Sequence, residues 1–178
     1  MQTAPSVLFV GSYPPRRCGI ATFTRDLAEG LAAVSGRPFR VIAMHNPADA
    51  PAYPPEVVRT IRRDHIEDYR EAAAFVNRAP VDVVCLQHEF GLFGGEAGAH
   101  LFEFLRLLEK PVVATLHTVI RRPAPEYREA TLALIRHAHR LVVMSQVARE
   151  ILLDTYGAPA EKIRLIPHGV PDPPGADP

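Results

Sequence analysis

The chain has few cysteines, no excess charge of either sign and no long apolar run. Two cysteines, Cys18 and Cys85, among 178 residues are too few for a disulfide framework, so we expect reduced thiols. The 20 basic and 20 acidic residues balance, which gives no electrostatic basis for binding nucleic acid or an anionic membrane. Neither a stretch of roughly 20 apolar residues nor a secretion signal is present. These absences predict a cytoplasmic domain with no nucleic-acid partner and no transmembrane segment.

A metal site is not expected either. The pair His88-Glu89 is similar to the start of a zinc-protease motif, but the H-E-x-x-H pattern fails because its last position is Leu92. A metal ion would need more ligands than this loop offers, and the two cysteines are distant in sequence. The sequence therefore predicts no metal ligands around His88.

The motifs of dinucleotide binding and of serine hydrolases are missing too. After Gly11 the next glycine is Gly19, so the fingerprint G-x-G-x-x-G is absent and an NAD cofactor is not expected. Ser145 has no adjacent histidine in the local sequence and no G-x-S-x-G motif. The sequence instead predicts that Ser145 caps a helix that begins at Gln146.

Proline is abundant, with 18 residues, and is concentrated in two segments. The segment 47–55 (PADAPAYPP) predicts a surface loop, and the segment 171–178 (PDPPGADP) predicts a linker. We therefore assign residues 1–170 to one domain and residues 171–178 to the start of a linker. A chain of this length is sufficient for one domain with a continuous core.

Short apolar runs, rich in β-branched residues, alternate with helical patterns along the chain. Apolar runs of this kind are typical of strands buried on both faces of a parallel sheet. They lie at 7–10, 41–44, 81–86, 112–116, 141–144 and 163–166, with a weaker run at 57–61. Apolar spacing predicts helices at about 19–34, around 69–76, from just after Gly95 to Leu108, around 134–138 and around 147–152, the last one capped by Gly157. The alternation predicts an α/β fold with a Rossmann-like, doubly wound and mainly parallel sheet.

Ligands of such sheets bind beyond the carboxyl ends of the strands, and the loop after the first strand ends in a helix. Gly19, Ile20 and Ala21 open that helix, so their N–H groups are expected to be unpaired and to favour a phosphate. From the spacing alone, a turn followed by a helix start is the preferred interpretation.

Three further strand ends carry polar or aromatic candidates. His88 and Glu89 suit the hydroxyl groups of a sugar, although local capping explains these two residues equally well. Phe90 offers a ring for stacking on a sugar, although an aromatic residue in a loop more often serves packing. His117 directly follows the run 112–116 and is expected in the crevice, where a hydrogen-bonded core histidine is the alternative. The remaining two candidates are His45, for an acceptor cleft, and Arg121, for an anionic acceptor or as a solvated residue.

The order of these motifs resembles that of the retaining, two-domain glycosyltransferases of family 4. The segment 166–172 (IPHGVPD) is similar to the hinge of that family, IP(N/H)GV(D). The segment 115–118 (TLHT) is similar to its TxH(D/T) motif. Residues 13–20 (YPPRRCGI) are similar to its opening motif, in which Cys18 replaces the first of two glycines. The resemblance extends from Val7 to Asp172.

This resemblance implies one half of a GT-B fold, the N-terminal domain on the acceptor side. The implied reaction moves a hexose from a nucleotide sugar to a hydroxyl of a carbohydrate or other acceptor, with retention and with no cofactor besides the donor. His117 would meet the donor sugar near the reacting carbon, and a C-terminal, donor-binding domain would follow Pro178. Two alternatives stay open, a sugar-nucleotide epimerase of the GT-B type and a stand-alone flavodoxin-like ligand-binding domain.

Overall fold

The computed structural model describes residues 4–46 and 52–169. The predicted linker 171–178, the domain boundary before it and residues 47–51 of the predicted proline loop lie outside the described residues. The strands are β1 (Val7–Gly11), β2 (Arg40–His45), β3 (Val57–Arg62), β4 (Val83–His88), β5 (Val112–Leu116), β6 (Arg140–Val143) and β7 (Ile163–Leu165). The α-helices are α1 (Gly19–Ser35), α2 (Ile66–Arg78), α3 (Leu101–Leu107), α4 (Pro125–His137) and α5 (Gln146–Tyr156), with short 3-10 turns η1 (Phe90–Leu92), η2 (Glu96–Gly98) and η3 (Ala160–Lys162).

All seven strands form one parallel sheet in the order β3-β2-β1-β4-β5-β6-β7. The predicted parallel α/β sheet is therefore confirmed, and the weaker run at 57–61 is a full strand at one edge. The chain builds outward from β1 to β3 and then returns to the other side of β1 to add β4. The order of the strands thus reverses between β1 and β4, which is the place where ligands of open α/β sheets bind.

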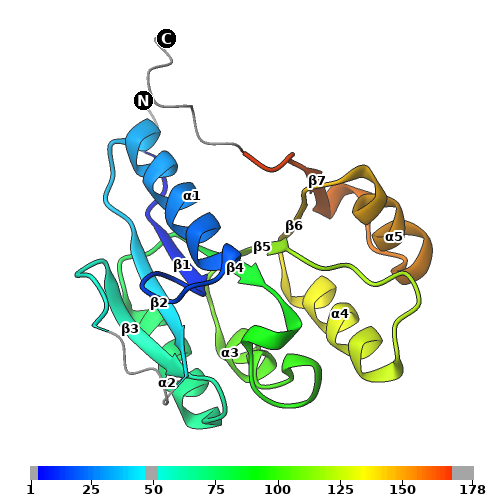
Figure 1. Cartoon of the computed structure of the whole chain (residues 1–178), viewed down its shortest axis with the longest axis horizontal. Helices are drawn as coiled ribbons and strands as arrows, with labels where there is room; N and C mark the ends of the chain where they lie inside the picture. The colour runs from blue at the N-terminus through cyan, green and yellow to red at the C-terminus, as the bar shows by residue number, and fades with distance from the viewer. Residues whose placement is uncertain (1–3, 47–51, 170–178) are drawn as a thin grey trace.

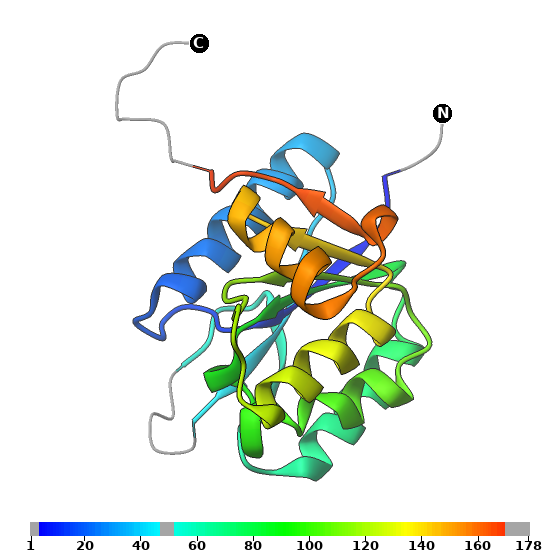
Figure 2. The same ribbon diagram turned by 90° about the vertical axis from the view of Figure 1, so that its right-hand side faces the viewer.

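The helices divide into two layers, as Figures 1 and 2 show. Helix α1 lies on one side of the sheet. On the other side α2 packs on α3, α3 on α4 and α4 on α5. This separation follows from right-handed crossovers, because a connection that moves toward β2 places its helix on the opposite face from one that moves toward β7.

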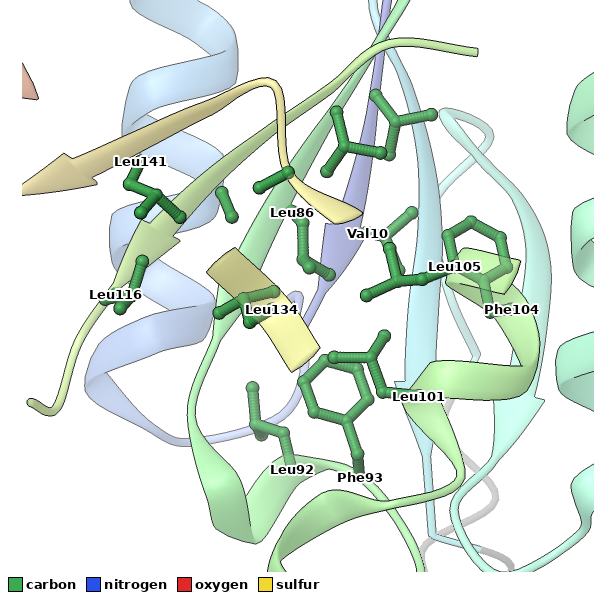
Figure 3. Close-up of a cluster of buried hydrophobic side chains, with 14 of the residues drawn as sticks. Val10, Leu86, Leu92, Phe93, Leu101, Phe104, Leu105, Leu116, Leu134 and Leu141 are labelled. Atoms are coloured by element: carbon green, nitrogen blue, oxygen red, sulfur yellow. The ribbon is translucent and has the colours of Figure 1, made fainter. Parts of the chain in front are cut away.

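The larger part of the core lies between the sheet and the layer of helices α2 to α5 (Figure 3). Side chains of alternate strand residues, such as Val10, Leu86 and Leu116, meet Phe104 of α3 and Leu134 of α4 there. A smaller cluster on the other face contains Phe9, Tyr13, Ala28, Val41 and Ala43. Successive residues of a strand point to opposite faces, which is why both faces draw on the same apolar runs.

The predicted caps of α5 are confirmed. The Ser145 hydroxyl accepts a hydrogen bond from the Ala148 N–H at 3.1 Å, and Gly157 ends the helix in the left-handed conformation, with φ of 64°.

The helix predicted from just after Gly95 begins later than expected, at Leu101. Gly95, Ala97 and Gly98 all have positive φ angles, of 77°, 49° and 81°, which a right-handed helix cannot accommodate. The apolar spacing of Ala97 with Leu101 and Leu105 therefore misplaced the start of the helix by one turn.

Candidate functional site

The strands β1 and β4 approach each other closely where they end. A Cβ atom at Gly11, the last residue of β1, would lie 2.8 Å from Cβ of Gln87. Glycine therefore makes room for the Gln87 side chain, which is 0% exposed. The residues that follow these two strands lie at the carboxyl edge of the sheet.

His117 lies at the same edge of the sheet, immediately after β5. Its backbone N–H donates to the His88 carbonyl at 3.0 Å, which continues the pairing of β4 with β5. Its Nε2 atom is hydrogen-bonded to Oε1 of Gln87 at 2.9 Å. The ring also meets the ring of Phe23 on α1 edge to face, at 5.0 Å between centroids. Three segments distant in sequence thus hold one half-buried imidazole.

The surroundings of His117 have opposing effects on its pKa. Burial lowers the pKa of His117, the Glu89 carboxylate raises it, and His168 lowers it further, with a net decrease. His168 comes from the segment after β7, and its ring lies 5.0 Å from that of Phe23. The imidazole of His117 is consequently neutral at neutral pH, with one nitrogen as donor and the other as acceptor.

Glu89 is held mainly by local contacts. Its Oε1 atom accepts from the Phe90 N–H at 3.0 Å, so it caps η1, and its Oε2 atom accepts from the Thr118 hydroxyl at 2.5 Å. The capping that the sequence offered as an alternative is therefore present. The second contact ties the loop after β4 to the loop after β5, and each carboxylate oxygen keeps a lone pair for a further donor.

His88 lies in the core. Its ring is 2% exposed, stacks on Phe93 at 6.0 Å and meets Phe90 edge to face at 4.9 Å. Burial, and to a lesser extent His117, lower the pKa of His88 to about 4. Phe90 is itself buried, with Tyr127 against its ring. The geometry thus favours packing for His88 and Phe90, and the sugar contact expected for them stays a prediction.

The N-terminus of α1 is partly capped. The Ala21 N–H donates to the Cys18 carbonyl at 3.1 Å and to its Sγ atom at 3.4 Å. The expectation that three N–H groups are unpaired is therefore wrong for Ala21, because the residue before the helix offers a sulfur as a cap. Within the described residues, no group accepts a hydrogen bond from the N–H of Gly19 or Ile20.

The other two candidates lie apart from His117. His45 ends β2, next to the ring of Tyr53 at 6.2 Å. Arg121 is exposed, and its carbonyl accepts from the Thr155 hydroxyl in the last turn of α5 at 3.5 Å. The structure thus brings together His117 and Glu89, with Gly19 at the start of the neighbouring helix, and it does not bring Arg121 to them.

Sequence reasoning missed Gln87 and Phe23. The signal for Gln87 was a polar residue at the end of a buried apolar run, directly before a candidate histidine. Phe23 had no comparable signal, because an aromatic residue on the apolar stripe of a helix is indistinguishable from a core residue.

No three His, Cys, Asp or Glu side chains of residues 4–46 and 52–169 are placed to hold a metal ion together. In the same residues, no helix has the length and apolar character needed to span a membrane. A hollow of about 550 Å³ lies at the opposite, amino edge of the sheet, between Ser6, Arg37, Asp82 and Lys110, and so is separate from His117.

Comparison with known proteins identifies the family. The family model for Glycosyltransferase Family 4 matches residues 18–172. The chain belongs to Glycosyltransferase Family 4. This family match includes the candidate residues Gly19, His88, Glu89 and His117, together with Gln87. A comparison with curated protein sequences found no match.

Solved glycosyltransferases have the same fold as this family 4 chain. A glycosyltransferase from Rickettsia africae ESF-5 is 16% identical, with a TM-score of 0.62 over 93% of this chain and 44% of that one. An alpha-glucosyltransferase in complex with UDP and a 13-mer DNA containing an A:G mismatch is 12% identical, with a TM-score of 0.57 over 80% of this chain and 38% of that one. A further structure of an alpha-glucosyltransferase (AGT) in complex with UDP is 12% identical, with a TM-score of 0.56 over 80% of this chain and 35% of that one. The chain spans less than half the length of these proteins.

Proposed function

We propose that this chain is the acceptor-side, N-terminal domain of a glycosyltransferase that moves a hexose from a nucleotide sugar to an acceptor hydroxyl with retention. The observation that carries the proposal is the position of His117 in a family 4 domain, where it is hydrogen-bonded to Gln87 on β4, one of the two strands between which the strand order reverses. The proposal includes a second domain that binds the nucleotide, and no cofactor besides the donor. The cytoplasmic location expected from the two cysteines, both free thiols, also stays a prediction.

In the proposed reaction this domain positions groups and stabilises charge. Transfer from a nucleotide sugar leaves a diphosphate, whose developing charge can be stabilised by fixed hydrogen-bond donors. The N–H groups of Gly19 and Ile20, at the positive end of α1, are suited to a phosphate oxygen. His117 offers a hydrogen bond to the transferred sugar, close to the reacting carbon. Glu89 keeps free lone pairs for a sugar or acceptor hydroxyl.

The first test replaces His117 by alanine in the intact protein, with a panel of nucleotide sugars as donors. We expect a loss in turnover on the order of 100-fold with retained folding, because one hydrogen bond made to the transition state is removed. His65→Ala is the matched control, since His65 is exposed and its side chain forms no cap bond at α2. NMR spectra of the product give its anomeric configuration. NMR spectra of the recovered donor show whether it has been epimerised.

Two results would contradict the assignment. Near-native transfer by His117→Ala, with a much lower melting temperature, would make His117 a structural residue. Conversion of the donor to an epimer, without transfer to an acceptor, would favour the sugar-nucleotide epimerase instead.

A further inference from the structure

We infer that Gln87 is a positioning residue that holds neutral His117 in the tautomer with the proton on Nε2. Its meaning for catalysis rests on the proposed function. The structural part of the inference concerns only the hydrogen bond between the two side chains, and therefore can be tested without a donor sugar.

The orientation of the Gln87 amide determines the tautomer. Its Oε1 atom faces Nε2 of His117 at 2.9 Å, and its Nε2 atom donates to Sγ of Cys85 at 3.4 Å. An amide oxygen only accepts, so the imidazole nitrogen that faces it has to carry the proton. Burial raises the pKa of the Cys85 thiol to about 12, so its sulfur is a neutral partner. His117 thus donates from Nε2 and keeps the Nδ1 lone pair.

The Gln87 side chain has little freedom to turn away. It is 0% exposed, and its Cβ atom would lie 2.8 Å from a Cβ at Gly11, so β1 packs directly against it. A buried amide that loses its hydrogen-bond partner destabilises the folded protein, which favours the bond to His117 over a separated pair. The edge of the Phe23 ring against His117 further limits rotation of the imidazole.

A fixed tautomer of His117 determines which ring nitrogen can accept a hydrogen bond from the substrate. In a neutral histidine, the hydrogen bond made by one ring nitrogen determines whether the other nitrogen carries a proton. With Nε2 engaged by Gln87, His117 presents Nδ1 as an acceptor to a hydroxyl group of the bound sugar. The other tautomer would offer an N–H instead, and the hydroxyl group could then bind His117 only as an acceptor.

The decisive measurement is the tautomer of His117 in the intact protein labelled with 15N-histidine. Long-range 1H–15N correlation spectra at neutral pH distinguish a protonated from a bare ring nitrogen, and the His117 signals are assigned by their loss in His117→Asn. We expect a single species with a protonated Nε2 and a bare Nδ1. A single species with a protonated Nδ1 would overturn the inference, without any mutation of Gln87.

Variants of Gln87 test the cause. In Gln87→Leu we expect a mixture of both tautomers, whereas Gln87→Glu should restore the Nε2-protonated form and raise the pKa of His117 by adding a carboxylate. The titratable groups that face this ring otherwise, Glu89, His88 and His168, are the same in both variants. A pure Nε2-protonated form in folded Gln87→Leu would show that Gln87 does not set the tautomer.

The transfer assay then separates this inference from the proposed function. In the intact protein we expect Gln87→Leu to lower kcat by about 10- to 100-fold, because a misplaced contact has costs of that order, with partial recovery in Gln87→Glu. If His117→Ala leaves transfer unchanged, the proposed function of His117 fails while the tautomer result stands. If His117→Ala abolishes transfer and folded Gln87→Leu does not slow it, the positioning role of Gln87 fails.

Discussion

At the scale of single residues, two histidines next to each other in space have opposite environments. His88 is paired in register with Leu116, so His117 falls on the other face of the sheet. His88 therefore joins the larger core with Phe90 and Phe93, whereas His117 meets Gln87 and Phe23 on the side of α1. One step along the sequence decides which imidazole is accessible to a ligand.

The burial of His88 predicts an acid-sensitive fold. The pKa of His88 is about 4 in the folded protein, below its ordinary value of 6.5. Between these two values the unfolded chain binds more protons, so the free energy of unfolding falls as the pH is lowered from 6.5 to 4. The fall due to His88 amounts to about 3 kcal/mol, and it levels off below pH 4.

Urea unfolding of the protein and of His88→Gln, from pH 7 to pH 4, measures this effect. Subtracting the two curves removes the titration of carboxylates and of the other histidines. We expect the difference in unfolding free energy to shrink steadily over this range. Parallel curves would mean that His88 takes up its proton as readily in the folded state as in the unfolded chain.

The sequence was informative about residues whose position depends on the chain alone. His117 and Glu89 follow strands, so their place at the carboxyl edge could be predicted from the apolar runs. The burial of His88 depends on its stacking on Phe93, which the turns after Glu89 place against it. The position of the His117 ring depends on its contacts with Gln87 and Phe23. Contacts of this kind arise only after the strands have paired, and no local pattern encodes them.

At the scale of elements, the loop from Glu89 to Ala99 is anchored to the segment that joins β3 to α2, at the edge of the sheet formed by β3. Gly94 fits tightly against the chain before α2, where a Cβ atom at this position would lie 2.1 Å from the Arg63 carbonyl oxygen. The Gly94 N–H donates to the Tyr69 hydroxyl, which in turn donates to the same Arg63 carbonyl. These bonds fix the position of the loop that carries Phe90 and Phe93.

Gly94→Ala should therefore destabilise the protein by about 3 kcal/mol or more, because the backbone oxygen in its way cannot rotate aside. Gly91→Ala is the matched control, since a Cβ at Gly91 meets nothing within 4 Å and the residue is exposed. Chemical denaturation gives both values. Equal stability of the two variants would show that the loop can detach from Arg63 at little cost.

Elements with regular periodicity were predicted well, and the exceptions have a physical cause. Helix α1 has the predicted range, but Leu27 and Leu31 of its apolar stripe are exposed, and its buried residues are Ala21, Thr24 and Ala28. The ends of α5 agree with their predicted caps. The start of α3 does not, because Ala97 holds a positive φ of 49°, a conformation that sequence patterns assign to glycine or asparagine. This residue lies in the loop that Gly94 anchors to Arg63, and the helix begins only after the loop, at Leu101.

At the scale of the whole molecule, the chain is short compared with its solved neighbours. It covers 44% of the Rickettsia glycosyltransferase and 38% and 35% of the two alpha-glucosyltransferase chains. We expect residues 1–178 by themselves to show no glycosyl transfer and weak binding of nucleotide sugars, because the proposed donor contacts belong mainly to a second domain. Within residues 1–178, the proposed contacts to the phosphate groups of the donor are only the N–H groups of Gly19 and Ile20.

Calorimetric titration with several nucleotide sugars, alongside a transfer assay, tests this expectation. The intact protein under the same conditions is the positive control, and the backbone NMR spectrum of the 178-residue chain verifies that it is folded. Tight binding together with turnover by the isolated chain would show that the domain needs no partner and would contradict the two-domain proposal.

The central place of β1 also has a consequence for how the protein is made. The ribosome produces β1 first, but one of its neighbours, β4, begins at residue 83, which is 76 residues after residue 7. At about 5–20 residues per second, one edge of the nascent β1 waits roughly 4 to 15 seconds for its partner. During that time its N–H and C=O groups are open to strands of other chains. Gln87 meets Gly11 only when β4 docks, so the support of His117, which also needs β5, is completed only after this late, long-range step of folding.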